Sequence, residues 1–182
     1  MTAQKDIENA LPQKQCARCG YPDCARYAAA VLEGESTGLC EPGGLAVARE
    51  LARLTGRPFQ APADEEPEAR VARIRPESCI GCTKCIAVCP VDAIAGSSKH
   101  LHAVIRTWCT GCAKCAAVCP TDCIEMLEDA PWTRERALEA RRRYLAKAVR
   151  TEMRRLEREK MLKEQSEKKR DMLSDMLKGR WR

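Results

Sequence analysis

Two runs of cysteine carry the clearest chemical signal in this chain of 182 residues. Each has the spacing C-x2-C-x2-C-x3-C-P, which places three sulfurs on one short turn at three corners of a [4Fe–4S] cubane. In two-cluster ferredoxins the last cysteine of each run ligates the other cluster. We therefore assign one cluster to Cys79, Cys82, Cys85 and Cys119, and a second to Cys89, Cys109, Cys112 and Cys115.

The two runs are copies of one unit, because residues 79–95 match residues 109–125 at 11 of 17 positions. In this alignment the thirteenth cysteine, Cys123, is equivalent to Ala93, so we expect it to fill a small packed site beside a cluster. Gly81 and Gly111 lie inside the turns, where we expect a positive φ or a close approach to the cluster.

Zinc is disfavoured at the two runs, since zinc motifs rarely use three cysteines in one turn. A disulfide framework is disfavoured by the odd cysteine count and the absence of a secretory signal.

A third set of four cysteines lies near the N-terminus, with gaps of two, four and fifteen residues. It consists of Cys16, Cys19, Cys24 and Cys40. Three close thiolates and a fourth returned by a helix, predicted over Ala25–Glu33 and ended by Gly34, suit a single [4Fe–4S] cluster. This spacing is less specific than that of the paired runs, and by itself it leaves a tetrahedral zinc site open.

Four segments together resemble the RnfB/RsxB iron–sulfur proteins of the Rnf/Rsx electron-transport complex, which are cytoplasmic-facing components of a membrane oxidoreductase. They are LPQKQCARCGYPDC at 11–24, CEPGG at 40–44, CIGCTKC at 79–85 and CPTDCIE at 119–125. The resemblance covers about residues 5–128 and implies that the N-terminal quartet binds the family's extra [4Fe–4S] cluster. Family members usually begin with a membrane-spanning helix. No apolar stretch here approaches the roughly 18 residues needed to cross a bilayer, so we expect a soluble form without that helix.

We expect an α+β fold in four regions. These are an N-terminal helical [4Fe–4S] domain (1–55), a Pro-rich acidic linker (56–69), a bacterial-type two-cluster ferredoxin module (70–128) and a basic helical tail (129–182). The first should end in a helix over about Leu45–Leu54, and the module should contain strands at Val71–Arg75 and Ala103–Thr107. Because the chain has one Phe, three Tyr and three Trp, no large apolar core is available, and metal–thiolate bonds must hold these regions.

The C-terminal tail differs in composition from the rest of the chain. From residue 131 it has 18 Lys and Arg against 9 Asp and Glu, while the whole chain has a net charge of +6. Thr133 is a plausible helix cap and Gly179 a plausible stop, which predicts one long helix or two. Its apolar stripe, Leu138, Leu145, Val149, Met153 and Leu156, is broken after Leu162, which disfavours a long coiled coil.

Other candidate residues have simpler interpretations. Twelve cysteines already account for three clusters, so His100 and His102 are not needed as ligands, and we expect surface or hydrogen-bonding roles for them. Trp108 precedes Cys109 and is expected to pack against the module or to shield a cluster from water.

The sequence predicts an electron carrier or electron-input subunit that passes single electrons through three [4Fe–4S] clusters. It has no G-x-G-x-x-G, P-loop, flavin or nicotinamide motif, so we expect no catalytic site of its own. Expected partners are a reductase, a ferredoxin or flavoprotein, or Rnf/Rsx subunits. The resemblance implies a cytoplasmic protein, and the basic tail could fold back on its own clusters, steer an acidic redox partner or associate peripherally with the cytoplasmic face of the inner membrane. The alternatives are a solvated tail without a partner, a nucleic-acid-associated iron–sulfur protein, which the tail's few aromatic residues disfavour, and a structural zinc protein.

Overall fold

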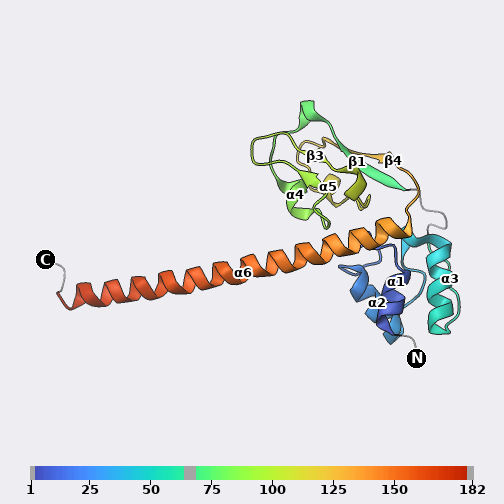
Figure 1. Cartoon of the computed structure of the whole chain (residues 1–182), viewed down its shortest axis with the longest axis horizontal. Helices are drawn as coiled ribbons and strands as arrows, with labels where there is room; N and C mark the ends of the chain where they lie inside the picture. Colours follow the sequence, from blue (N-terminus) through green and yellow to red (C-terminus); the bar gives the residue numbers. More distant parts are fainter. Residues whose placement is uncertain (1–2, 64–68, 180–182) are drawn as a thin grey trace. The chain divides into compact units, whose positions relative to one another are not determined.

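The structure is a computed structural model that describes residues 3–63 and 69–179, and it divides into two compact units, Met1–Tyr144 and Leu145–Arg182. The first unit mixes helices and strands, and the second consists of the continuing C-terminal helix (Figure 1). Residues 64–68 of the predicted linker lie outside the described residues.

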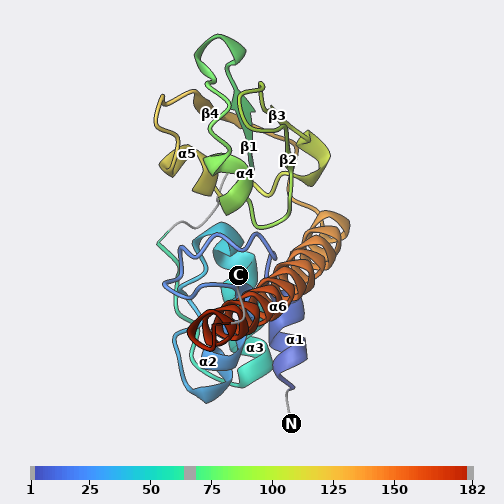
Figure 2. The same cartoon turned by 90° about the vertical axis from the view of Figure 1, so that its left-hand side faces the viewer.

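Three helices form the N-terminal part of the first unit, and they lie together in both views (Figures 1 and 2). They are α1 (Gln4–Ala10), α2 (Cys24–Glu33) and α3 (Gly44–Thr55). Asp23 caps α2 by accepting a hydrogen bond from the Arg26 N–H at 2.8 Å, and Gly34 ends it with φ 132°. A small core in which Ile7, Tyr27 and Leu51 are fully buried joins the three helices. Thus α2 and α3 confirm the predicted helices, whereas α1 was not predicted.

The module that follows contains two small antiparallel sheets, each built from both copies of the repeat. Strand β1 (Arg70–Ile74) pairs with β4 (Ile124–Glu128), and β2 (Ile94–Ala95) pairs with β3 (Ala103–Val104). Short helices α4 (Lys84–Val88) and α5 (Lys114–Ala117) follow the turns that carry the cysteines. Because the repeat offset of 30 residues relates β1 to β3 and β2 to β4, the halves are pseudo-equivalent. The predicted strands are confirmed as β1 and a shorter β3, while β2 and β4 were not predicted.

Helix α6 (Arg134–Leu177) is continuous, as the absence of Gly and Pro allowed. The predicted cap is present, because Thr133 Oγ1 accepts a hydrogen bond from the Arg136 N–H at 3.3 Å. In the first unit its buried residues are Ala137 and Ala140, while Leu138 of the predicted stripe is 48 % exposed. In the second unit the remaining stripe residues are also exposed, and ion pairs such as Arg155 with Glu152 follow the helix surface. Within residues 3–63 and 69–179, no helix combines the length and apolar character required to span a membrane.

Candidate iron–sulfur sites

Each of the three predicted cysteine quartets lines its own cavity. The N-terminal cavity is lined by Cys16, Cys19, Cys24 and Cys40. The Cys79 cavity is lined by Cys79, Cys82, Cys85 and Cys119. The Cys109 cavity is lined by Cys89, Cys109, Cys112 and Cys115. The structure therefore brings together the fourth cysteine of each run with the three close cysteines of the other run.

All thirteen cysteines are free thiols in the structure. In the part of the chain that the structure describes, no group of three or more His, Cys, Asp or Glu side chains is arranged to hold a single metal ion.

A chain of hydrogen bonds fixes the loop that carries the first N-terminal cysteines. The Cys24 N–H donates to Gln15 Oε1 at 2.9 Å, Gln15 Nε2 donates to Gln13 Oε1 at 3.0 Å, and Gln13 Nε2 donates to the Glu8 carbonyl at 2.5 Å. Both glutamines are buried. They adopt left-handed backbone conformations, with φ 56° at Gln13 and 54° at Gln15, and Ala17 follows with φ 64°.

The thiols of the N-terminal cavity are held in an apolar environment. Burial raises the pKa of Cys24 to about 12, and it raises the pKa of Cys40 and Cys19 as well. A buried thiol with a raised pKa becomes a thiolate only when a cation offsets the lost hydration, and the iron of a cluster is such a cation. The cavity also includes Lys14, which is 6 % exposed and whose pKa burial lowers. The residues present therefore fit a four-thiolate iron–sulfur cluster with one nearby cationic side chain.

The turns of the two ferredoxin halves have the same backbone shape. Gly81 and Thr83 have φ 66° and 63°, and their equivalents Gly111 and Ala113 have φ 67° and 61°. The predicted positive φ at both glycines is confirmed. The two glycines also lie close to protein backbone, because a Cβ at Gly81 would lie 2.6 Å from the backbone N of His100 and a Cβ at Gly111 would overlap the Arg70 carbonyl. Each turn is thus packed against the backbone of the opposite half.

The thiols of the two ferredoxin cavities differ in their surroundings. Burial raises the pKa of Cys85 to about 11 and that of Cys115 to about 12. Burial also acts to raise the pKa of Cys119, but hydrogen bonds from the backbone and side chains of Cys123 and Thr121 outweigh it and bring the pKa to about 7. Hydrogen-bond donors therefore gather at one sulfur of the Cys79 cavity.

His102 is a functional candidate whose position the sequence did not reveal. Its ring is 5 % exposed, its Nδ1 lies 3.1 Å from Cys85 Sγ, and its Nε2 lies 3.3 Å from the Ser97 carbonyl oxygen. Gly96 makes room for this ring, because a Cβ there would overlap the imidazole. The expected hydrogen-bonding role is confirmed, but its partner is a thiol of the Cys79 cavity. His100, by contrast, is exposed.

Cys123 is buried, as expected for a small packed site. It lines the Cys79 cavity, and its Sγ lies 3.4 Å from Cys119 Sγ. Alignment of the two repeats identified Cys123 from the sequence, and it could also have identified His102, which is equivalent to Ala72 in the other half.

Several hydrogen bonds connect the N-terminal part of the first unit with the ferredoxin module and its C-terminal extension, and two of them reach the loop before Cys16. Thr110 Oγ1 donates to the Lys14 carbonyl at 3.0 Å, and both residues are buried. Trp132 Nε1 donates to the Pro12 carbonyl at 2.7 Å. Thr110 lines the Cys109 cavity and Lys14 lines the N-terminal cavity, so the Thr110 contact joins the walls of these two sites.

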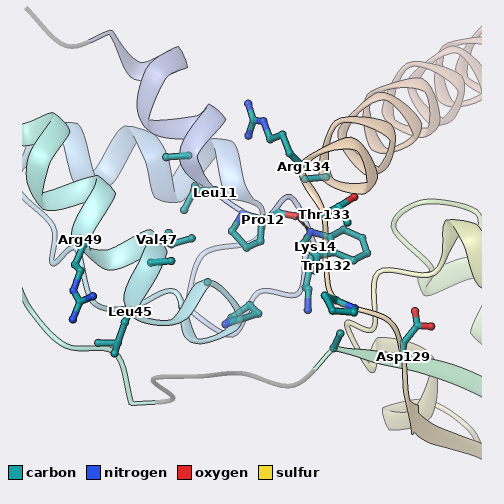
Figure 3. A pocket seen from close by; sticks show the side chains of 17 residues that line it. Leu11, Pro12, Lys14, Leu45, Val47, Arg49, Asp129, Trp132, Thr133 and Arg134 are labelled. Carbon is teal, nitrogen blue, oxygen red and sulfur yellow. Dashed lines mark hydrogen bonds between the residues drawn. The ribbon is translucent and has the colours of Figure 1, made fainter.

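An open cleft lies beside the N-terminal cavity (Figure 3). Pro12 and Lys14 line both spaces. Figure 3 shows Lys14 next to Trp132, and the Lys14 Nζ lies 5.3 Å from the centre of a Trp132 ring. Cation–π attraction of this kind holds the Lys14 ammonium beside the cysteine quartet.

Trp108 packs against the ferredoxin core, as expected. The Arg143 guanidinium lies 3.3 Å from the centre of its ring, and Arg143 Nε donates to the Val91 carbonyl at 2.9 Å. The start of α6 is therefore attached to the module near the Cys109 cavity, which Val91 also lines.

Two family models match the segments that carry the cysteine quartets. A 4Fe-4S dicluster domain matches residues 72–126, and a putative Fe-S cluster family matches residues 11–42. Together with the fold and the three cavities, these matches identify the chain as an iron–sulfur protein with a 4Fe-4S dicluster domain.

Curated relatives give a more specific similarity. The B subunit of the ion-translocating oxidoreductase complex of Shewanella sediminis is 58 % identical over 123 residues, which covers 66 % of this chain and 65 % of the relative. The proteins of the same name from Pseudomonas paraeruginosa and Alcanivorax borkumensis are 57 % and 55 % identical, covering 66 % and 69 % of this chain and 65 % and 66 % of those relatives. The resemblance to the RnfB/RsxB proteins is therefore confirmed, although the chain spans slightly less than two thirds of these relatives. No solved structure matches the chain.

Proposed function

We propose that this chain is an iron–sulfur electron-transfer protein that passes single electrons through three [4Fe–4S] clusters, as a component of, or partner to, an Rnf/Rsx-type oxidoreductase. One observation carries the proposal, namely that each cysteine quartet lines a separate cavity. The relatives are named as subunits of an ion-translocating oxidoreductase complex, which supports such a setting.

The proposed ligands follow from the cavity linings. The cysteines at 16, 19, 24 and 40 would hold the N-terminal cluster, those at 79, 82, 85 and 119 the second, and those at 89, 109, 112 and 115 the third. When bound, the clusters supply reversible one-electron transfer. The chain supplies thiolates in fixed turns, a largely apolar lining that limits water, and the Lys14 ammonium, which offsets negative charge at the N-terminal site.

Contact between the cluster-bearing parts supports transfer within one chain. The Thr110 hydroxyl and the Lys14 carbonyl share a buried hydrogen bond between the Cys109 and N-terminal cavities. No solvent layer separates the two walls at this point, so the thiolates of both quartets would sit within one continuous protein matrix. We infer that this contact keeps the N-terminal site coupled to the ferredoxin module.

We further propose that the basic tail serves docking at the cytoplasmic face of the inner membrane or on an acidic redox partner. From residue 131 the chain has 18 basic and 9 acidic residues, whereas four-thiolate clusters are negatively charged. Basic residues near an anionic bilayer contribute about 1 kcal/mol each to association. Exposed Val149 and Met153 add apolar surface to the same helix.

Anaerobic purification with iron and acid-labile sulfide counted per chain tests the proposed function. We expect about twelve irons and about twelve sulfides, with electron paramagnetic resonance of the reduced protein showing spin coupling between neighbouring clusters. Zinc without sulfide would contradict the proposal. About eight irons would restrict it to the ferredoxin module, and the missing site would then be sought among the N-terminal cysteines.

A further inference from the structure

We propose that the two ferredoxin sites are built to differ in reduction potential, with the cluster of the Cys79 cavity accepting an electron at the higher potential. This inference rests on the proposed function, since it concerns how the chain's own residues tune the clusters. It assigns a tuning role to three side chains outside the ligand set: His102, Thr121 and Cys123.

Equivalent positions in the two halves carry opposite chemistry. The offset of 30 residues makes His102, Thr121 and Cys123 equivalent to Ala72, Val91 and Ala93. The first three line the Cys79 cavity and the second three line the Cys109 cavity. At each of these three pairs the Cys79 cavity has a side chain able to donate a hydrogen bond, and the Cys109 cavity has an aliphatic one. A fourth pair, Ile80 and Thr110, has its hydroxyl in the Cys109 cavity, but that hydroxyl donates to the Lys14 carbonyl.

His102 makes the shortest of these contacts. Its Nδ1 lies 3.1 Å from Cys85 Sγ in a buried setting. A metal-bound thiolate can only accept a hydrogen bond, so we assign the ring proton to Nδ1, which donates it to the sulfur; the 3.3 Å contact of Nε2 with the Ser97 carbonyl, another acceptor, is then not a hydrogen bond. The sheets explain why the other half lacks an equivalent. Ala72 pairs with Met126, so in that half of the module the long side chain belongs to the opposite strand. In the other half Gly96 has no side chain, and the His102 ring occupies the space beside it.

Thr121 and Cys123 act on a second sulfur of the same cavity. Cys119 Sγ lies 3.7 Å from Thr121 Oγ1 and 3.4 Å from Cys123 Sγ. Hydroxyl and thiol groups at these separations are weaker donors than the imidazole N–H, and we expect their effects to be smaller.

Backbone N–H groups that donate to cysteine sulfurs do not distinguish the two cavities in the same way. The Cys123 N–H donates to Cys119 Sγ at 3.4 Å, and its equivalent, the Ala93 N–H, donates to Cys89 Sγ at 3.2 Å. The Ala72 N–H donates to Cys109 Sγ at 3.5 Å and partly offsets the polar advantage of the Cys79 cavity. The difference between the halves therefore comes from the side chains.

The direction of the effect follows from charge. Each one-electron reduction takes a four-thiolate cluster from a charge of about −2 to about −3, and the added charge spreads onto the sulfurs. A hydrogen bond to sulfur becomes stronger as the sulfur becomes more negative, so the donors stabilise the reduced form. More donors at the Cys79 cavity therefore mean a higher potential. In film voltammetry the electrode supplies the electron that reduces each cluster.

The test is anaerobic film voltammetry of the full holo-chain, with iron counted and paramagnetic resonance recorded for each variant. We expect His102→Leu, which fills the space without a donor, to shift only the higher ferredoxin wave downward, by at least tenfold in the reduction equilibrium, or about 59 mV. Thr121→Val and Cys123→Ala should shift the same wave less. The triple variant should bring the two ferredoxin waves together.

Matched variants separate tuning from mere packing. His102→Asn places an amide N–H near the Nδ1 position and should restore most of the potential, while His100→Ala, at an exposed site, should change nothing. Val91→Thr with Ala93→Cys should raise the lower wave. The inference is overturned if His102→Leu and the triple variant retain full iron and leave the higher wave in place, or if they move the lower wave instead. Absence of about twelve irons or of any reversible wave in the parent chain would instead contradict the proposed function.

Discussion

The two halves of the ferredoxin module share a backbone and differ in what lines their cavities. Both place glycine and a second residue in left-handed conformations within the cysteine turn, and both pack that turn against the opposite half. The linings differ, as His102 and Ala72 illustrate at one pair of equivalent positions. The turn therefore fixes the positions of the cysteine thiols, while the side chains around the sulfurs remain available to set their electronic properties.

The largest expected effect is a loss of iron, and it shows whether each half supplies the fourth cysteine of the other half's site. Cys119→Ala should remove the cluster of the Cys79 cavity and lower the iron content from about twelve to about eight per chain, because a three-thiolate site is incomplete. The higher ferredoxin wave should disappear with it. Cys123→Ala is the matched control four residues away, and it should keep about twelve irons. Loss of the lower wave in Cys119→Ala would mean that each run holds its own cluster.

The next largest expected effect is a loss of stability when the glycine of either cysteine turn is replaced. Gly81→Ala and Gly111→Ala should each lower the free energy of unfolding of the holo-protein by about 3 kcal/mol or more, because a Cβ would be strained by φ and would meet backbone of the other half. Gly56→Ala is the control, since its φ is also left-handed, at 68°, but nothing lies within 4 Å. It should cost about 1 kcal/mol. Anaerobic denaturant unfolding measures all three, and equal losses would refute the packing explanation.

A third prediction extends the comparison to the N-terminal cavity, which has a cation where the ferredoxin cavities have none among their lining residues. Lys14→Met keeps the carbonyl that accepts from Thr110 but removes the ammonium. We expect the potential of the N-terminal cluster to fall by about tenfold in the reduction equilibrium, or about 59 mV. Arg18→Met, whose side chain is 42 % exposed and screened by water, should shift it less. Equal shifts would point to long-range charge alone.

The smallest effect concerns the attachment of α6 to one half only. Arg143→Ala removes the stacking on Trp108 and the hydrogen bond to Val91, and it should lower the free energy of unfolding by about 1 to 2 kcal/mol. Ser78 occupies the equivalent of Trp108 in the other half, so no second site of this kind is expected there. Arg142→Ala, with a side chain 78 % exposed, should cost less than about 0.5 kcal/mol. Indistinguishable losses would remove Trp108 as an anchor for α6.

Short-range sequence signals predicted much of this fold. The helix over 25–33, its stop at Gly34 and the cap at Thr133 follow from local residue types, and the structure confirms each. The unpredicted β2 has only two residues, and β4 is defined by its pairing with β1, so neither has a periodic pattern of its own. The apolar stripe through Leu138 does not mark the packed face of α6, because Leu138 is exposed while Ala137 and Ala140 are buried.

The candidate sites divide in the same way. The quartets could be proposed from spacing alone, because ligand spacing is a local property of the chain. The position of His102 beside Cys85 depends on strand pairing across 17 residues and on the space left by Gly96. The contact between Thr110 and Lys14 joins residues 96 apart, and no local pattern predicts it.

Controlled-potential coulometry of the anaerobically purified chain tests the central claim most directly, since it counts the electrons that the cysteine quartets allow the protein to store. The three-cluster assignment predicts about three electrons taken up and released reversibly per chain, two of them at distinct potentials that belong to the ferredoxin halves. Uptake of no electrons by a chain with its full complement of metal would contradict it.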